Sequence, residues 1–281
     1  KARFDEEANI NWAEKLESLG VQVVYGVVGL KTHAKMLLIT RRDKRTGQLQ
    51  RYGHLSTGNY NARSARLYTD LSHLTCDAAI TEDMDAVFRH LSSHNRLPTL
   101  QQLVMAPFHL HSHMLERIGQ AASAAAKGKD ARIVLKMNAL TDEVLIAALI
   151  DAGALGVQID LIVRGACMLP AQVPGRTENI RVRSVIGRFL EHTRVFYFAW
   201  GTHEEVYLSS ADWMHRNMLR RVELAWPVHH RKLRQRIIDE CLADYLHDDR
   251  NAWQLQSDGR YQPPMRPSAG FGAQNMLMKN S

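Results

Sequence analysis

The chain has 281 residues, of which 45% are hydrophobic and 23% are charged. This length is enough for one large or two ordinary domains, and the apolar fraction is typical of a globular protein with a substantial core. No apolar run is long enough to span a membrane. The net charge of +7 favours a polyanionic partner, and nucleic acid, acidic lipid, nucleotides and inorganic polyphosphate all fit it.

The cysteines, Cys76, Cys167 and Cys241, are scattered and lack the spacing of a metal site. This usage predicts buried, reduced thiols in a cytoplasmic protein. The sequence enters almost directly into a helical pattern, and we interpret it as the carboxy-terminal part of a longer protein.

Helix and strand patterns alternate in the first part of the chain, which favours an α/β fold. The predicted elements are a helix over 5–20 capped by Asp5, strands over 21–28, 29–39 and 50–57, a hairpin turn at 41–47, and a helix over 81–91 with Glu82 and Asp83 in its first turn.

The strand predicted over 29–39 begins with polar residues, among them His33 and Lys35. Residues two apart in a strand point to the same face, so these two side chains are predicted to point together. A neutral imidazole can attack phosphorus, and a nearby ammonium can hold the phosphoryl oxygens. A histidine and a lysine at a strand entrance are more often structural, so one such pair is a weak indication of function.

The stretch 58–61 interrupts the strand pattern and predicts a tight turn. Asn59 in this turn is a candidate to bind phosphate or to orient the histidine. Tyr68 follows closely and could hold a nucleotide base, although it suits ordinary packing equally well. His54 alternates in phase with its strand and is interpreted as structural.

A domain boundary is predicted near 95–106, and the β-α-β order that follows favours a parallel strand pair. Arg164 comes directly after the second strand of this pair, at the carboxyl end where ligands of open α/β sheets bind. The predicted elements of this part are a helix over 107–127, a strand over 132–138, a helix over 141–152 capped by Thr141, strands over 157–163, 180–186 and 220–228, a helix over 229–246 and a poorly ordered tail from about 257.

His192 and Arg194 repeat the histidine-x-basic pattern ahead of an apolar strand at 195–198. Each of the two histidine stretches is followed by a strand that ends in small polar residues, at 52–59 and at 206–212. The chain is therefore predicted to contain two similar units with one histidine each. Two histidines at one phosphorus would allow one to attack while the other protonates the leaving oxygen.

Several longer segments resemble the carboxy-terminal half of bacterial polyphosphate kinases of the type built on the phospholipase D fold. The resemblance covers nearly the whole chain and weakens only in the tail. The segments that carry it are Ala2–Glu6, Gly29–Lys35, Thr57–Asn61, Ala65–Asp70, Leu161–Cys167, Leu190–Arg194 and Tyr207–Met214.

This resemblance implies two similar phospholipase D-like α/β domains, with mixed sheets flanked by helices and the active site between them. The first domain would comprise residues 1–104 and be incomplete at its amino terminus. The second would comprise residues 105–281 with a flexible tail from about 257. The family's activity is the reversible transfer of the ATP γ-phosphate to inorganic polyphosphate through a phosphohistidine, with Mg²⁺ and ATP/ADP.

The resemblance also assigns roles to individual residues. His33 falls at the autophosphorylated histidine, and His192 falls at a second active-site histidine that contacts the nucleotide phosphates. Tyr68 and Arg164 fall at nucleotide-binding positions, and Arg3 falls at a position associated with the magnesium and phosphate site. Arginine has only hydrogen-bond donors, so Arg3 is expected to act through phosphate oxygens.

Lys35 and Arg194, with Arg164, are expected to offset charge on the transferred phosphoryl group, and Asn59 to contact phosphate. The resemblance further implies a homo-oligomer and a peripheral association with the membrane, and no nucleic-acid partner is expected.

Two departures from the general phospholipase D pattern bear on the reaction. That pattern places an Asp after four further residues beyond the His-x-Lys, and here Thr40 and Ala199 stand at those positions. Arg194 also replaces the second lysine. These changes argue against a phosphodiesterase.

A phospholipase D-like phosphodiesterase or nuclease nevertheless stays as an alternative, because it uses the same histidine chemistry with water or alcohol as acceptor. A non-catalytic module that binds polyanions through the basic surface is the other.

Overall fold

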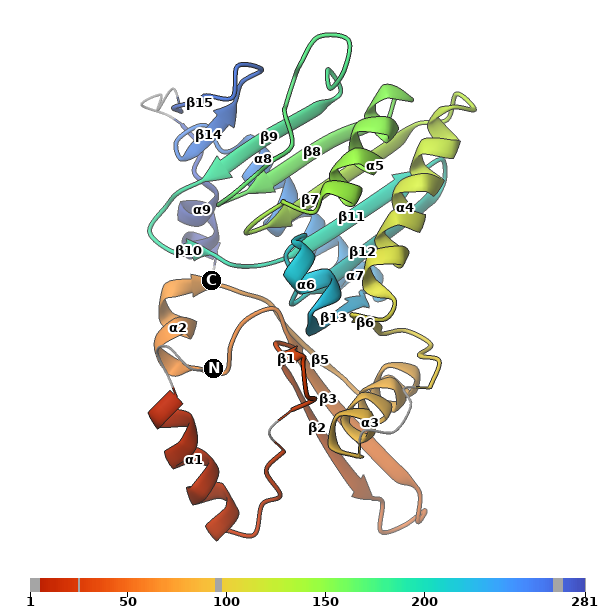
Figure 1. The fold of residues 1–281 in the computed structure, drawn as a ribbon, viewed down its shortest axis with the longest axis vertical. Coiled ribbons are helices and arrows are strands. Elements are labelled where there is room, and N and C mark those ends of the chain that lie inside the picture. Colours follow the sequence, from red (N-terminus) through yellow and green to blue (C-terminus); the bar gives the residue numbers. More distant parts are fainter. Residues whose placement is uncertain (1–5, 25, 94–97, 265–269, 281) are drawn as a thin grey trace.

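The structure, a computed structural model, describes residues 6–24, 26–93, 98–264 and 270–280. We call the part up to residue 93 the first unit and the part from residue 98 the second unit. Figure 1 shows the first unit as a small group of elements beneath a much larger sheet. Among the described residues, none of the helices combines the length and the apolar character needed to cross a bilayer.

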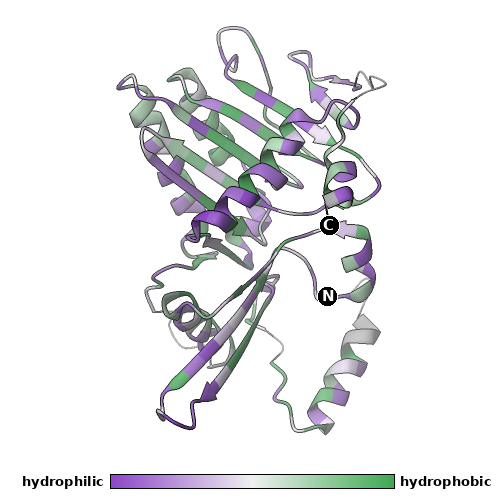
Figure 2. Cartoon of the chain, turned by 180° about the vertical axis from the view of Figure 1, so that it is seen from behind, coloured by the Kyte–Doolittle hydropathy of each residue, from purple (hydrophilic) through white to green (hydrophobic). Residues whose placement is uncertain are grey.

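The first unit is built around an antiparallel sheet of three strands, in the order β2-β3-β5. Helix α3 covers one face of this sheet, where Leu55 and Met84 are fully buried. Leu37, Ile39 and Leu74 are between 49% and 78% exposed, and the β2–β3 hairpin mixes hydrophobic and hydrophilic residues (Figure 2). The elements are α1 (Glu6–Ser18), β1 (Lys31–Thr32), β2 (Met36–Arg42), β3 (Leu49–Ser56), α2 (Ala62–Leu67), β4 (Tyr68–Thr69), β5 (Ser72–Thr75) and α3 (Ala78–Ser93).

The second unit contributes nine strands to a ten-stranded mixed sheet. Along this sheet the strands follow the order β1-β13-β12-β11-β7-β8-β9-β14-β15, and β6 pairs with β13. The elements are β6 (Val104–Ala106), α4 (Leu110–Ala125), β7 (Ala131–Met137), α5 (Glu143–Ala154), β8 (Gln158–Val163), β9 (Ile180–Val185), β10 (Leu190–Glu191), β11 (Val195–Trp200), β12 (His203–Ser209), α6 (His215–Leu219), β13 (Arg221–Pro227), α7 (Arg231–Ile237), a π-helical turn (Ile238–Ala243), α8 (Asp244–His247), β14 (Ala252–Leu255), β15 (Tyr261–Gln262) and α9 (Ala273–Asn280).

Helices cover both faces of the large sheet (Figure 1). One face packs against α4 and α5, and residues such as Leu149 and Phe198 are fully buried there. The opposite face packs against the α7–α8 segment and against the first unit, so that Leu55 and Met84 share one apolar cluster with Val222. The expected α/β architecture, with mixed sheets flanked by helices, is confirmed.

Two short parallel strand pairs join the units. Strand β1 of the first unit pairs with β13, and β10 of the second unit pairs with β4. Each pair ends immediately before a histidine, because His33 follows β1 and His192 follows β10.

The predicted strand over 29–39 is not continuous. Lys31–Thr32 joins the large sheet, whereas Met36–Arg42 joins the small sheet. Residues 33–35 lie between them because the chain changes sheets at this point. The strand predicted over 21–28 is wrong as well, since the described residues of this stretch form no strand and Val21 and Val24 are 45% and 40% exposed.

Helix boundaries differ from the predictions where side chains provide other caps. Asp142, rather than Thr141, caps α5 by accepting a hydrogen bond from the Leu145 backbone (3.1 Å). Helix α3 begins at Ala78, so Glu82 and Asp83 lie beyond its first turn. The buried Asp83 instead accepts backbone hydrogen bonds from 101–103 and so fixes the connection between the units. The predicted cap Asp5 lies outside the described residues.

The carboxy-terminal part is more ordered than predicted. The helix over 229–246 is divided by the π-helical turn, and Cys241 and Tyr245 pack in the core. The prediction of a buried thiol is confirmed for Cys241 and wrong for Cys76, which is exposed. The prediction of a flexible tail from about 257 is wrong for the described part, because β15 pairs with β14 and α9 buries Ala273 and Gln274. The Gln274 amide exchanges two hydrogen bonds with the Phe189 backbone, which help to hold this helix against the rest of the second unit.

Candidate active site

His33 is held by a carboxylate from the other unit. Its Nδ1 lies 2.8 Å from Oε2 of Glu223, which follows Val222 on β13 and is completely buried. Ser210 and Asn217 also donate to the Glu223 carboxylate, at 2.5 and 2.7 Å. A carboxylate only accepts hydrogen bonds, so the His33 ring proton resides on Nδ1 and the Nε2 lone pair is available.

Lys35 lies beside that lone pair, with Nζ 3.0 Å from Nε2 of His33. Burial lowers the pKa of Lys35 to about 7, against an opposing effect of Glu223. Burial also lowers the pKa of His33 despite its bond to Glu223. His33 is therefore a neutral imidazole at neutral pH, and this is the form that can act as a nucleophile.

His192 has the same arrangement with the roles of the units exchanged. Its Nδ1 lies 2.9 Å from Oδ1 of Asp70, which belongs to the first unit. Thr57 donates to this carboxylate at 2.7 Å. Gly58 lets Asp70 approach the backbone, since a Cβ at that position would lie 2.2 Å from Asp70 Cγ. Burial lowers the pKa of His192, so it too is neutral.

Arg194 takes the place that Lys35 has in the other half. Its Nη1 lies 3.1 Å from Nε2 of His192 and donates to the Thr57 carbonyl at 3.3 Å. Its Nε and Nη2 donate to the two carboxylate oxygens of Asp212, at 3.2 and 3.1 Å. Burial alone would raise the pKa of Asp212, but Arg194 and further hydrogen bonds hold it below its usual value. This bidentate pair fixes the guanidinium over His192.

The backbone register explains why both histidines meet a carboxylate. In one pair Thr32 stands opposite Val222, one residue before His33 and Glu223. In the other pair Glu191 stands opposite Thr69, one residue before His192 and Asp70. Parallel pairing brings the next residue of each strand together, so the two units form two crossed histidine–carboxylate pairs.

Arg164 lies close to this site but is bound to protein groups. Its guanidinium donates to Asn138 Oδ1 at 3.0 and 3.2 Å and to the Glu191 carbonyl at 2.7 Å. Asn138 in turn donates to Asp212. Arg164 is therefore connected to the Arg194–Asp212 pair through the Asn138 side chain.

The other residues that the sequence analysis discussed lie in different places. The Tyr68 ring lies beside the His192 ring, with centroids 5.2 Å apart, and lines a cavity of 350 Å³. Asn59 is exposed in the loop after β3. Arg3 lies outside the described residues, and its assignment to the magnesium and phosphate site stays a prediction. His54 lies on the outer face of the small sheet and bonds to Tyr60 at 2.8 Å.

Glu223, Asp70 and Asp212 were not singled out as site residues from the sequence. Asp70 and Glu223 share a signal, because each lies 13 residues after the hydroxyl residue that donates to it, Thr57 or Ser210. Both acidic residues lie beyond the two repeated strand endings, 52–59 and 206–212, so the repeat itself does not include them.

The described residues contain no group of three or more His, Cys, Asp or Glu side chains that could hold a metal ion. The carboxylates nearest the histidines are already hydrogen-bonded by them. This donor set does not fit a magnesium ion held by protein ligands alone.

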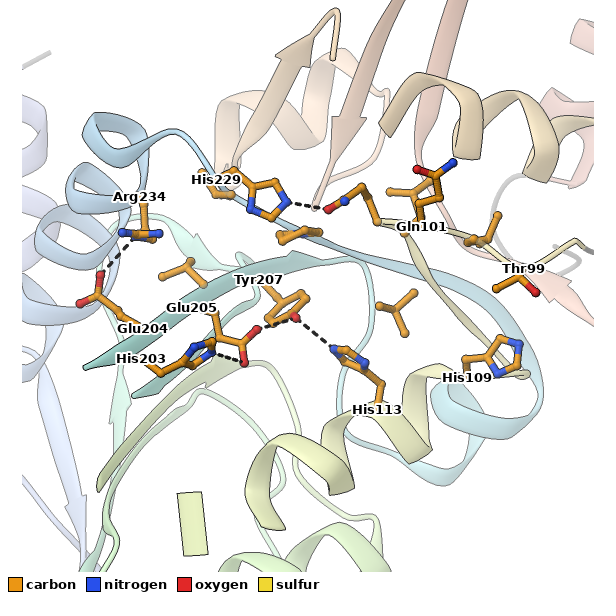
Figure 3. Close-up of a pocket in the computed structure, with 17 residues that line it drawn as sticks. Thr99, Gln101, His109, His113, His203, Glu204, Glu205, Tyr207, His229 and Arg234 are labelled. Atoms are coloured by element: carbon orange, nitrogen blue, oxygen red, sulfur yellow. Dashed lines mark hydrogen bonds and ion pairs between the residues drawn. The ribbon is translucent and has the colours of Figure 1, made fainter. Parts of the chain in front are cut away.

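A larger pocket of 430 Å³ lies elsewhere, between the 99–104 connection, α4, β12 and α7 (Figure 3). Figure 3 shows His113 pointing toward Tyr207, which donates to Glu205 at 2.7 Å. Of the predicted site residues that the structure describes, none lines this pocket. Size alone therefore does not identify the site, and the crossed histidines do.

Two family models match the chain. Polyphosphate kinase C-terminal domain 1 matches residues 1–97, and polyphosphate kinase C-terminal domain 2 matches residues 103–274. The chain belongs to the polyphosphate kinase family, and it corresponds to the carboxy-terminal half of its members.

Individual relatives agree with this. A polyphosphate kinase of Burkholderia cenocepacia is 55% identical over 262 residues, which are 92% of this chain and 38% of that protein. One of Paraburkholderia phytofirmans is 52% identical over 99% of this chain and 41% of its own length. The chain thus spans about two fifths of these curated relatives.

A solved polyphosphate kinase from Porphyromonas gingivalis matches the whole chain with a TM-score of 0.90 and 35% identity, over 42% of that protein. A phospholipase D family member from Salmonella typhimurium matches 58% of this chain with a TM-score of 0.37.

Proposed function

We propose that this chain carries the phosphoryl-transfer site of a polyphosphate kinase, which moves the terminal phosphate of ATP reversibly to inorganic polyphosphate. The observation that carries the proposal is the pair of crossed histidine–carboxylate contacts, His33 with Glu223 and His192 with Asp70. Each leaves a neutral Nε2 beside a basic side chain, so a nucleophile, a proton acceptor and charge stabilisation lie within one site.

In the first step Nε2 of His33 attacks the γ-phosphorus of ATP. The new N–P bond forms as the bond to the β–γ bridging oxygen breaks, and ADP leaves. In the second step a terminal oxygen of polyphosphate attacks the same phosphorus and the N–P bond breaks. Glu223 stabilises the positive charge that develops on the imidazole, because its carboxylate accepts a hydrogen bond from the Nδ1–H group.

His192 handles the proton at the oxygen opposite His33. Neutral His192 accepts a proton from an acceptor oxygen, and the reverse reaction returns it. Lys35 and Arg194 offset charge on the equatorial oxygens, and Arg164 supports Arg194 through Asn138 and Asp212. Tyr68 offers its ring to the nucleoside, next to the 350 Å³ cavity.

Magnesium has no step of its own in this scheme. The described side chains include no cluster of three or more His, Cys, Asp or Glu that could hold a metal ion, and Mg²⁺ would be held largely by the nucleotide phosphates. We retain Arg3 as a phosphate contact only.

A direct test compares His33→Ala with His54→Ala in the full-length protein. His54 is a matched control, since it is a histidine of the same unit on the outer face of the small sheet. Polyphosphate synthesis from ATP should be lost in His33→Ala and retained in His54→Ala. Normal synthesis by His33→Ala would overturn the proposal.

Three further properties remain proposals: a division into domains near residue 104, a homo-oligomer, and a cytoplasmic protein with peripheral membrane association. Sedimentation of the full-length protein, with and without vesicles, measures the last two.

A further inference from the structure

Glu191 occupies a position that the phosphoryl-transfer scheme does not use. It directly precedes His192, and its carboxylate is 4% exposed. Four side chains donate to it, and they come from four different parts of the fold. They are Lys136 of β7 at 2.7 Å, Thr69 of β4 at 2.9 Å, Tyr245 of α8 at 2.9 Å and Gln274 of α9 at 2.5 Å.

The four donors fill both carboxylate oxygens. Lys136 and Thr69 bind Oε2, and Tyr245 and Gln274 bind Oε1. Burial alone would raise the pKa of Glu191, but the charge of Lys136 and these hydrogen bonds hold it below its usual value. Lys136 also lies over the Tyr245 ring, 3.5 Å from its centroid. A buried carboxylate with this many donors is an ionised, fixed point in the structure.

Thr69 connects this point to the site. Its hydroxyl donates to Glu191 and accepts the His192 backbone N–H at 3.2 Å. Thr193 also donates to the Thr69 carbonyl at 3.0 Å. Tyr68 and Asp70, which contact His192, flank Thr69 in the sequence. Thr69 therefore helps to position both partners of the His192–Asp70 contact. It binds the His192 backbone through its hydroxyl, and it directly precedes Asp70 in the chain.

We propose that Glu191 is a positioning residue for His192 and that α9, through Gln274, is part of the active-site support. The inference rests on the proposed function. In the His33 half the residue at the matching position is Thr32, which is exposed. Among the described contacts, α9 reaches the His192 half of the site through Glu191.

The test uses the full-length protein and changes Thr69, because that leaves the Lys136–Glu191 ion pair intact. Thr69→Val removes the hydroxyl and keeps the shape, whereas Thr69→Ser keeps the hydroxyl. Thr177→Val is the matched control for a lost threonine hydroxyl, since Thr177 is buried in the second unit and accepts the Val173 N–H at 2.9 Å.

We expect Thr69→Val to lower kcat for polyphosphate synthesis about tenfold or more, because small displacements of a catalytic group are costly. The pH–rate limb that depends on His192 should also move, and Thr69→Ser should restore both. Glu191→Gln should act at least as strongly, since its amide would face two donors. Gln274→Leu should lower kcat by a smaller factor, through α9.

Equal kcat values and pH profiles in Thr69→Val and Thr177→Val would overturn the positioning role. So would a Thr69→Ser variant as impaired as Thr69→Val. Failure of the proposed function is distinguishable, since the unmodified full-length protein would then form no polyphosphate from ATP at all.

Discussion

The two halves of the site share one plan and differ in their cation. Both place a neutral histidine between a carboxylate from the other unit and a basic side chain. Arg194 is clamped by Asp212 and stays over Nε2 of His192. Lys35 forms no ion pair with a carboxylate in the described part of the chain, and burial lowers its pKa to about 7.

This difference fits the roles proposed for the two histidines. Lys35 can move or lose its proton and so leave Nε2 of His33 free to attack, whereas the fixed guanidinium of Arg194 stays beside Nε2 of His192, where it can hold a phosphoryl oxygen. The two carboxylates also differ in their exposure to solvent. The Glu223 side chain is fully buried, whereas the Asp70 side chain is 21% exposed. In the proposed scheme, the His33 half forms the bond to phosphorus, and the His192 half holds phosphate and moves a proton.

The largest effect should come from neutralising the two carboxylates separately. Glu223→Gln removes the negative charge opposite Nδ1 of His33 and places an amide N–H among groups that now donate to a carboxylate, so phosphohistidine formation should fall by about a thousandfold. Asp70→Asn should cost about a hundredfold, because His192 serves the proton step. Rapid-quench measurement of phosphoenzyme formation from ATP checks the first variant, and measurement of phosphate transfer from the phosphoenzyme to polyphosphate checks the second. Equal losses of the two variants in both steps would contradict unequal roles.

The packing of the units suggests a second comparison. Leu55→Ala in the small sheet and Leu161→Ala in the large sheet each remove a fully buried side chain and should cost about 2–5 kcal/mol. Leu55→Ala should speed hydrogen exchange in β2, β3 and α3 while β7 and β8 stay protected, since the small sheet has only three strands. Uniform acceleration throughout the chain would show that the units do not open separately.

The smallest effect concerns pH. Phosphate beside Lys35 favours its charged form, so binding should take up a proton above a pKa of about 7. Affinity for polyphosphate should therefore fall as the pH rises, by up to about tenfold per unit. Lys35→Arg keeps the charge and should remove this dependence. Calorimetry in buffers of different ionisation enthalpy measures the proton uptake, and an unchanged dependence in Lys35→Arg would exclude Lys35 as its source.

The two histidines could be predicted as candidate site residues because the pattern that indicates them is local in the sequence. The spacing of His33 with Lys35 and of His192 with Arg194 can be read from adjacent residues. Glu223 and Asp70 depend on the register of β1 with β13 and of β10 with β4. Strands β1, β4 and β10 have only two residues each. A strand of two residues is too short to be recognised from a hydrophobic pattern in the sequence.

The same limit explains the errors in the fold. Apolar residues over 21–28 satisfied a strand pattern, but the described part of this stretch pairs with no strand. The tail looked poorly ordered by composition, although Gln274 anchors α9 through Glu191 and Phe189. Long, periodic elements such as α4 and β7 were found close to their observed bounds.

The central claim is that His33 forms the covalent bond to phosphorus. The most direct measurement treats the full-length protein with ATP and locates the acid-labile phosphate by mass spectrometry of peptides kept at alkaline pH. The phosphate should reside on His33 in the unmodified protein and in Asp70→Asn. Phosphate on His192 in either protein, or none on any histidine, would contradict the roles assigned to the two halves.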